Sequence, residues 1–217
     1  MAPFELIIFD LDGTLIDSSE DLAISTNATR ANFGLPPLEQ SVINSYVGNG
    51  AAVLVRRAMG AEASEERVAE ALQFFLHYYR EHSLENTRPY DGIREVVDQL
   101  ANQGRLLGVL TNKPERISVD ILQALGMADR FFRIYGGNTF PEKKPQPTGI
   151  LRMCEEAQRE LTRTLMVGDS RVDIETARNA GVGSCGVTWG FQPETLAEQQ
   201  PDFTIDRPDA LLKIVSA

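Results

Sequence analysis

The sequence predicts an α/β protein in which a parallel sheet is flanked by helices and an all-helical segment is inserted near the N-terminus. Three observations support this fold class. From residue 89 onward, short apolar runs typical of buried strands alternate with helical patterns. Between residues 18 and 87 the pattern is helical throughout. Before that insertion, residues 6–8 form a short β-branched apolar run, which indicates one fully buried strand.

The composition excludes several classes of protein. The chain has 217 residues, 42% of them hydrophobic, which is enough to bury a core in one or two domains. Its formal charge of -10 argues against a nucleic acid as partner, because binding to a phosphate backbone requires a basic face. Cys154 and Cys185 are far apart, so we expect buried free thiols rather than a disulfide framework. Since the early apolar run is interrupted by Asp10 and no basic stretch precedes it, we predict no signal peptide, no membrane span and a cytoplasmic location.

Local signals define the helices of the inserted segment. Ser18 or Ser19 is suited to the N-cap of a helix that Gly34 ends. A second helical piece runs to about residue 47, and a short helix covers residues 51–59. From residue 64, apolar residues at helical spacing predict one long amphipathic helix, and they are Val68, Leu72, Phe75, Leu76 and Tyr79.

The rest of the chain predicts an alternation of strands and helices. The expected strands are residues 106–111, 131–135, 164–167, 184–188 and 203–205. Five helices are expected. The first contains Ile93 to Leu100, the second runs from Pro114 to Gly126, and the third contains Ile150 to Cys154. The fourth follows Ser170 and ends at Gly181, and the fifth lies at the C-terminus.

Polar residues follow the ends of these strands. Asp10 and Asp12 end the first strand, Thr111 and Asn112 end the second, and Asp169 ends a later one. In open parallel sheets the ligand lies beyond the carboxyl ends of the strands. We therefore expect these residues to meet at one edge of the sheet.

The residue types at this edge are suited to phosphate chemistry. Asp10, Asp12 and Asp169 supply the oxygen ligands that Mg²⁺ prefers. Zinc is disfavoured, because no histidine or cysteine lies near these strand ends. A carboxylate that attacks phosphate from about 4 Å at a dielectric of about 20 meets roughly 4 kcal/mol of repulsion per unit charge. A metal ion and Lys144, from a nearby loop, would offset this repulsion. Gly13 allows the backbone to turn sharply and to approach a ligand closely.

Four motifs resemble, in order and spacing, those of the haloacid dehalogenase-like hydrolase superfamily. They are Asp-Leu-Asp-Gly-Thr-Leu at residues 10–15, Thr111-Asn112, Lys144-Pro145 and Gly-Asp-Ser-Arg-Val-Asp at residues 168–173. The resemblance covers essentially the whole chain, and its first and last motifs are the most specific. It implies a Rossmann-like catalytic core of residues 1–17 and 88–217, with a helical cap of residues 18–87 that determines substrate specificity.

The resemblance also implies catalytic roles. Asp10 would be the nucleophile that forms an aspartyl-phosphate, and Asp12 would be the general acid for the leaving alcohol and then the base for water. Thr111 and the Asn112 amide would bind the transferring phosphoryl group, and Lys144 would neutralise it.

The same resemblance implies a metal site. The carboxylate of Asp10, the backbone carbonyl of Asp12 and Asp169 would hold Mg²⁺. Asp173 would orient Lys144 or a metal-bound water molecule.

Two readings of the cap stay open. Gly48, Asn49 and Gly50 precede a helix, where bare backbone amides and the helix dipole suit a small anion, yet the same residues are typical of a helix-breaking loop. Residues 46–58 and 202–206 resemble the phosphoglycolate phosphatase branch. Arg57 matches the arginine usual in that cap helix, where it either contacts substrate or lies on a solvated face; we favour the solvated face.

The sequence therefore predicts a Mg²⁺-dependent phosphatase for a small anionic phosphorylated metabolite, with 2-phosphoglycolate as the leading candidate. Pyrophosphatase and sugar-phosphate phosphatase activities are alternatives, and a phosphomutase is less favoured because it needs additional cap groups. A receiver-type signalling domain also carries a phosphoaspartate, but it is about half as long and lacks the Asp-x-Asp-Gly-Thr order. Monomer and homodimer are both compatible with the sequence.

Overall fold

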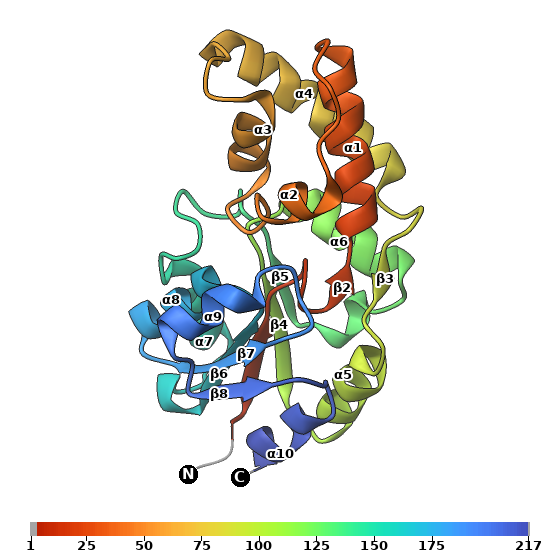
Figure 1. Ribbon diagram of the computed structural model, residues 1–217. Helices are drawn as coiled ribbons and strands as arrows, with labels where there is room; N and C mark the ends of the chain where they lie inside the picture. Colours follow the sequence, from red (N-terminus) through yellow and green to blue (C-terminus); the bar gives the residue numbers. More distant parts are fainter. Residues whose placement is uncertain (1–3, 217) are drawn as a thin grey trace.

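A parallel sheet forms the centre of the molecule (Figure 1). The computed structural model describes residues 4–216. The sheet has six strands in the order β5-β4-β1-β6-β7-β8. They are β1 (Leu6–Phe9), β4 (Leu106–Leu110), β5 (Arg133–Tyr135), β6 (Thr164–Gly168), β7 (Gly183–Val187) and β8 (Phe203–Ile205). Because β1 pairs with β4 on one side and β6 on the other, the residues after β1 lie at the middle of the sheet edge.

Helices cover both faces of the sheet. Ile7 and Phe9 of β1 belong to the apolar cluster shared with α5 (Ile93–Asn102), α6 (Glu115–Ala124) and α10 (Ala210–Ser216). Their neighbours Leu6 and Ile8 point to the other face and pack with α7 (Thr148–Ala157) and α8 (Arg171–Ala180). A strand buried on both faces reads as a continuous apolar run, which is why residues 6–8 predict a central strand. The predicted α/β, Rossmann-like fold is confirmed.

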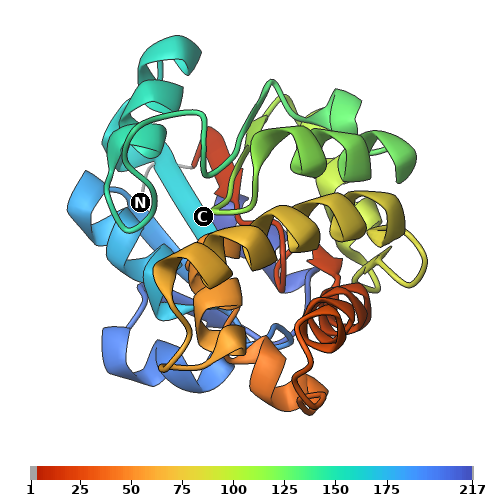
Figure 2. The same cartoon turned by 90° about the horizontal axis from the view of Figure 1, so that it is seen from above.

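The segment between β2 (Ile16–Asp17) and β3 (Arg88–Pro89) is helical, as predicted. It contains α1 (Ser19–Asn32), α2 (Gln40–Asn44), α3 (Ala51–Met59) and α4 (Glu65–His82). These helices lie together beyond the carboxyl ends of the strands, and in the view from above α4 passes across the core (Figures 1 and 2). Ser64 caps α4 by accepting a hydrogen bond from the Arg67 amide, and the buried residues of α4 recur at helical spacing.

The two crossings between this helical segment and the sheet pair with each other. β2 and β3 are antiparallel, with Ile16 opposite Pro89 and Asp17 opposite Arg88. Next to them, the buried carboxylate of Asp21 accepts hydrogen bonds from the backbone amides of residues 86 and 87. This ribbon was not predicted, because two residues per strand are too few to show an alternating pattern.

Smaller differences concern short elements. β5 begins at Arg133 rather than at residue 131, and a 3₁₀ helix (Ala128–Arg130) precedes it, with residues 131 and 132 between the two. The short helices at Leu161–Arg163, Pro193–Thr195 and Leu196–Gln199 were not predicted. Within residues 4–216, no helix combines the length and apolar character that crossing a membrane requires.

Candidate active site

The Asp10 carboxylate is fixed at the end of β1. The Asp10 amide continues the strand ladder by donating to the carbonyl of Val167 at 2.9 Å. Its side-chain Oδ1 accepts a hydrogen bond from the Leu11 amide at 2.7 Å and lies 2.9 Å from Nζ of Lys144. The residue is only 5% exposed. The Asp10 carboxylate is therefore buried, and its contacts with the Leu11 amide and Lys144 fix its orientation.

Lys144 joins β1 to α8. Its Nζ lies 2.6 Å from Oδ1 of Asp173, in the first turn of α8, as well as beside Asp10. The other oxygen of Asp173 accepts hydrogen bonds from the hydroxyl and the amide of Ser170, at 2.7 and 3.1 Å. Ser170 thereby fixes Asp173, and Asp173 fixes Lys144.

Asp169 follows β6 and lies against the turn after β1. Its Oδ2 accepts a hydrogen bond from the Phe191 amide at 2.6 Å. Gly13 has φ of 82°, and a Cβ atom there would lie 2.3 Å from Oδ2 of Asp169. A Cβ atom at Gly190 would lie 2.2 Å from Cβ of Asp169. Gly13 was predicted to approach a ligand; the close approach found in the structure is to Asp169.

Three carboxylates form a cluster suited to a divalent cation. Oxygen atoms of Asp10, Asp169 and Asp173 lie within 4.8 Å of one another. Burial raises the pKa of Asp10 from 3.8 to about 6, although Lys144 opposes this. Burial, together with Asp173 and Asp10, raises the pKa of Asp169 well above its ordinary value. One lysine leaves two of the three negative charges uncompensated, so the all-oxygen cluster fits a hard dication such as Mg²⁺.

The carboxylate of Asp12 lies outside this cluster and has its own partners. Its two oxygens lie 2.8 and 3.1 Å from Nζ of Lys113, and Oδ1 also accepts a hydrogen bond from the Ser18 hydroxyl at 2.6 Å. Ser18 or Ser19 was expected as the N-cap, and Ser18 occupies the N-cap position of α1, although its side chain makes no cap bond. The sequence placed Asp12 correctly at the strand end; the identity of its partners depends on the folded chain.

Lys113 is the site residue that sequence reasoning missed. It is buried, and its Nζ donates to the hydroxyl of Tyr79, on α4, at 2.6 Å. Burial would lower the pKa of Lys113, but the charge of Asp12 and the hydroxyl of Tyr79 outweigh it and raise the pKa, so the side chain is cationic. The available signal was its position directly after Thr111-Asn112 at the end of β4.

Asn112 connects the core to the helical segment. Its Nδ2 donates to the carbonyl of Gly48 at 2.8 Å and to the carbonyl of Lys144 at 3.1 Å, and its Oδ1 accepts from the Lys144 amide at 3.1 Å. A Cβ atom at Gly50 would lie 3.0 Å from the carbonyl oxygen of Asn112. Thr111 is buried beside it, and its hydroxyl accepts a hydrogen bond from the Lys113 amide at 3.2 Å. The side chain of Asn112 is thus occupied in holding two loops together.

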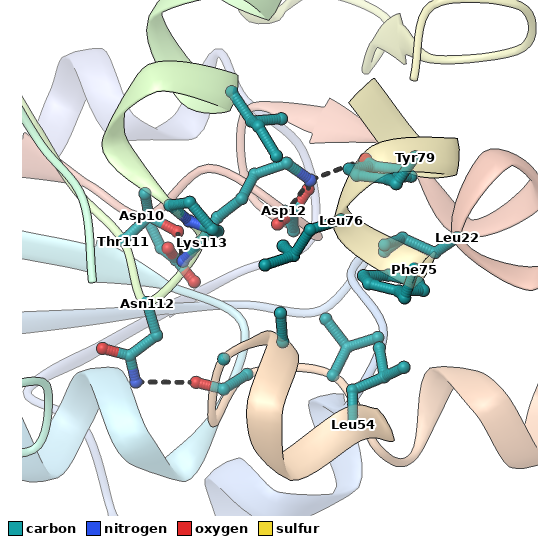
Figure 3. Close-up of a pocket in the computed structure, with 16 residues that line it drawn as sticks. Asp10, Asp12, Leu22, Leu54, Phe75, Leu76, Tyr79, Thr111, Asn112 and Lys113 are labelled. Atoms are coloured by element: carbon teal, nitrogen blue, oxygen red, sulfur yellow. Dashed lines mark hydrogen bonds and ion pairs between the residues drawn. The ribbon is translucent and has the colours of Figure 1, made fainter. Parts of the chain in front are cut away.

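A cavity lies between the strand ends and the helical segment (Figure 3). The core contributes Asp10, Asp12, Thr111, Asn112, Lys113, Pro114 and Ile117. The helical segment contributes Leu22, Val47, Gly48, Gly50, Ala51, Leu54, Phe75, Leu76 and Tyr79. The volume of the cavity that is open to water-sized groups is about 40 Å³. On the same measure, one water molecule needs about 10 to 15 Å³. The cavity is therefore polar on the core side, apolar on the other, and sized for a small ligand.

Two of the predicted cap residues lie elsewhere. Arg57 is exposed, its Nη1 lies 3.4 Å from the carbonyl of Ser45, and its guanidinium is 5.9 Å from the centre of the Tyr46 ring. Neither Arg57 nor Asn49 lines the cavity, whereas Gly48 and Gly50 do. The structure therefore does not bring Arg57 to the other predicted site residues.

Comparisons with known proteins agree with this geometry. A family model described as haloacid dehalogenase-like hydrolase matches residues 7–187. A phosphoglycolate phosphatase of Vibrio vulnificus (strain CMCP6) is 39% identical over 218 residues, which cover 97% of this chain and 96% of that protein. One from Agrobacterium fabrum is 41% identical over 204 residues, with 93% and 88% coverage. The crystal structure of a predicted phosphoglycolate phosphatase from Haemophilus somnus 129PT superposes with a TM-score of 0.93 at 35% identity and covers 99% of both chains.

The matched region extends from β1 to β7 and contains each of the strand-end residues described above. The chain belongs to the haloacid dehalogenase-like hydrolase family.

Proposed function

We propose that this protein is a Mg²⁺-dependent phosphatase that hydrolyses 2-phosphoglycolate, or a closely similar small phosphomonoester, through an aspartyl-phosphate on Asp10. The observation that carries the proposal is the environment of Asp10. It is a buried carboxylate at the middle of the sheet edge, held by Lys144 and the Leu11 amide, and it lines the cavity between the core and the helical segment. Relatives named phosphoglycolate phosphatase support the choice of substrate.

In the first half of the reaction, an Asp10 oxygen attacks phosphorus and the bond from phosphorus to the alkyl oxygen breaks. The proton of Asp12 goes to the departing oxygen, which leaves as an alcohol. Thr111, at the end of β4, and the Asn112 amide would bind the phosphoryl oxygens, and Lys144, which pairs with Asp10, would neutralise their charge.

In the second half, water attacks the phosphorus of the aspartyl-phosphate and gives its proton to the Asp12 carboxylate. The bond between phosphorus and the Asp10 oxygen breaks, which releases inorganic phosphate and regenerates Asp10. Asp173 acts indirectly, because it holds Lys144.

Mg²⁺ would be held by Asp10 and Asp169, with Asp173 beside them, and it supplies charge neutralisation for the attack of a carboxylate on a phosphate dianion. The raised pKa values of Asp10 and Asp169 support this assignment, since burial, together with the neighbouring carboxylates, disfavours their ionised forms, and a bound dication would offset both effects. The Asp12 backbone carbonyl completes the proposed set of ligands.

The size of the cavity supports a small substrate. A hexose phosphate requires more room and many hydroxyl partners, whereas the wall formed by Leu22, Leu54 and Phe75 is apolar. We also propose that residues 18–87 act as a cap domain on a core of residues 1–17 and 88–217, because their helices close this cavity.

The test is steady-state phosphate release from phosphoglycolate, pyrophosphate and hexose phosphates, with and without Mg²⁺. We expect the largest kcat/KM with phosphoglycolate, no turnover in excess EDTA, and recovery when Mg²⁺ is restored. A clear preference for pyrophosphate or a hexose phosphate would overturn the substrate and leave the chemistry intact. Full activity of Asp10→Asn would refute the covalent mechanism.

A further inference from the structure

Lys113 and Tyr79 form an incomplete hydrogen-bonding group inside the cavity. An ammonium group has three N–H donors. Nζ of Lys113 has two partner groups, the Asp12 carboxylate, whose oxygens lie at 2.8 and 3.1 Å, and the hydroxyl of Tyr79 at 2.6 Å. The two oxygens of one carboxylate lie close enough together to share a single N–H, so one N–H donor remains. The Tyr79 hydroxyl accepts the hydrogen bond from Lys113, and it donates its own proton to no group among residues 4–216. Within the part of the chain that the structure describes, two donors therefore lie side by side without acceptors.

The N–H donor of Lys113 and the hydroxyl of Tyr79 both face the cavity that Asp10 lines. Lys113 and Tyr79 line it together with Asp10 and Asp12, and Figure 3 shows the end of Lys113 between Asp12 and Tyr79, next to Leu76. Within the described chain, Lys113 is the only cationic side chain among the residues that line this cavity. The apolar residues Leu22, Leu54 and Phe75 that also line the cavity offer no hydrogen bond to an anion.

The charges of the cavity require such a group. An anion without a partner in apolar surroundings is strongly disfavoured. Lys144 is already shared between Asp10 and Asp173, on the phosphate side. A second anionic group on the substrate, lying on the side of Asp12 away from Asp10, would contact Lys113 and Tyr79. Within the described residues, the cavity wall contains no other cationic side chain for it.

We propose that Lys113 and Tyr79 are the receptor for the substrate's carboxylate, and that they select phosphate esters of short hydroxy acids over uncharged alkyl phosphates. This inference rests on the proposed function. One carboxylate oxygen accepts from the third N–H of Lys113 and the other from the Tyr79 hydroxyl. Because Tyr79 is on α4 and Lys113 follows β4, the receptor exists only while the helical segment lies against the core.

The alternative role for Lys113 is to hold Asp12 in place. That role affects every alkyl phosphate by the same factor, because each needs the same proton transfer. A carboxylate receptor affects only substrates that carry a carboxylate. The ratio of kcat/KM for phosphoglycolate to kcat/KM for ethyl phosphate therefore separates the two roles, since the common factor cancels.

The experiment measures this ratio with Mg²⁺ in the full-length enzyme and in Lys113→Met, Tyr79→Phe and the matched control Lys213→Met, an exposed lysine of α10. Loss of a charge-assisted hydrogen bond in Lys113→Met should lower the ratio by about 10- to 100-fold. Loss of a neutral donor in Tyr79→Phe should lower it by about 5- to 10-fold. Lys113→Arg should restore part of the ratio, and Lys213→Met should keep the wild-type ratio. An unchanged ratio in Lys113→Met and Tyr79→Phe would overturn the receptor.

A binding measurement on the wild-type protein covers the case in which Lys113→Met does not fold. Calorimetry with Mg²⁺ compares 3-phosphonopropionate, which is not hydrolysed, with propylphosphonate. We expect the carboxylate to tighten binding by about 10-fold or more. Equal affinities would contradict the receptor even if phosphoglycolate is hydrolysed, whereas tighter binding of the carboxylate without any turnover of phosphate esters would contradict only the proposed hydrolysis.

Discussion

The two walls of the cavity differ in how their side chains are held. On the core side, Asp10 lines the cavity and pairs with Lys144, which in turn pairs with Asp173. Both ion pairs are shorter than 3 Å, and all three residues are buried. On the helical side, Leu54 and Phe75 contribute apolar surface, and Tyr79 reaches the core through one hydrogen bond to Lys113.

From this difference we expect the core side to carry out the chemistry and the helical side to choose the substrate. The core side follows the strand ends of a rigid sheet, where positions of charged groups are reproducible to a fraction of an ångström. The helical side is attached through the β2–β3 ribbon and through contacts such as that between Asn112 and Gly48. Changes on the core side should therefore abolish turnover, and changes on the helical side should change the preferred substrate.

The largest effect is expected for Asp10→Asn. Loss of the nucleophile should reduce kcat by about 10⁴-fold or more, because no other group in the site replaces it. The amide is nearly isosteric, so the variant should remain folded. Phosphate release and rapid acid quenching to detect the aspartyl-phosphate check this prediction; the isosteric control Asp206→Asn, at an exposed position, should have wild-type turnover.

Metal affinity tests the division of labour between the strand-end carboxylates. We expect Asp169→Asn to weaken Mg²⁺ binding by about 10- to 100-fold and Asp12→Asn to weaken it by only a few fold. The reason is that Asp169 belongs to the carboxylate cluster, whereas the Asp12 carboxylate pairs with Lys113. Titration of the metal-free protein by calorimetry measures both values, and the opposite order would refute the division.

The core side should also give the metal-free protein a specific pH dependence. The folded state raises the pKa of Asp10 from 3.8 to about 6, mainly through burial. The protonated carboxyl is then favoured by folding, so this contribution to stability is fully present below pH 3.8 and is lost as the pH rises through about 6. A shift of about 2 units corresponds to about 3 kcal/mol.

Urea unfolding in EDTA between pH 4.5 and 7.5 measures this loss of stability. Asp10→Asn should lack the part that Asp10 contributes, whereas Asp169, whose pKa is also raised, keeps its own contribution. Mg²⁺ should suppress the loss in the wild-type protein by binding the ionised carboxylates. A metal-free protein that gains stability over the same range relative to Asp10→Asn would contradict the assignment.

The smallest effect on catalysis is expected on the helical side. Leu54→Ala enlarges the cavity without removing a charged group, so kcat/KM for phosphoglycolate should fall only a few fold, and kcat/KM for larger phosphate esters should rise relative to it. The same change should lower the free energy of unfolding by about 2 to 5 kcal/mol, because Leu54 is buried. Parallel assays with phosphoglycolate and 3-phosphoglycerate test the selectivity. A loss as large as that of Asp10→Asn would remove the distinction between the two walls.

The sequence predicted the core side better than the helical side, for physical reasons. A buried strand that ends in Asp10 and Asp12, and a later one that ends in Asp169, are local patterns, and parallel pairing brings their ends together. The contact between Tyr79 and Lys113 joins residues 34 positions apart on different elements, and no local pattern encodes it. For the same reason, Arg57 was a candidate by resemblance alone, and the fold leaves it exposed.

The β2–β3 ribbon has a consequence for how this protein can change over time. The inserted helices leave the core at Ile16–Asp17 and return at Arg88–Pro89, and these two points are paired neighbours. An insertion whose ends are adjacent can be lengthened, shortened or exchanged without altering the register of the sheet. Such a chain can acquire a new substrate by replacing one contiguous stretch of its gene, while the groups that break the phosphate ester stay in place.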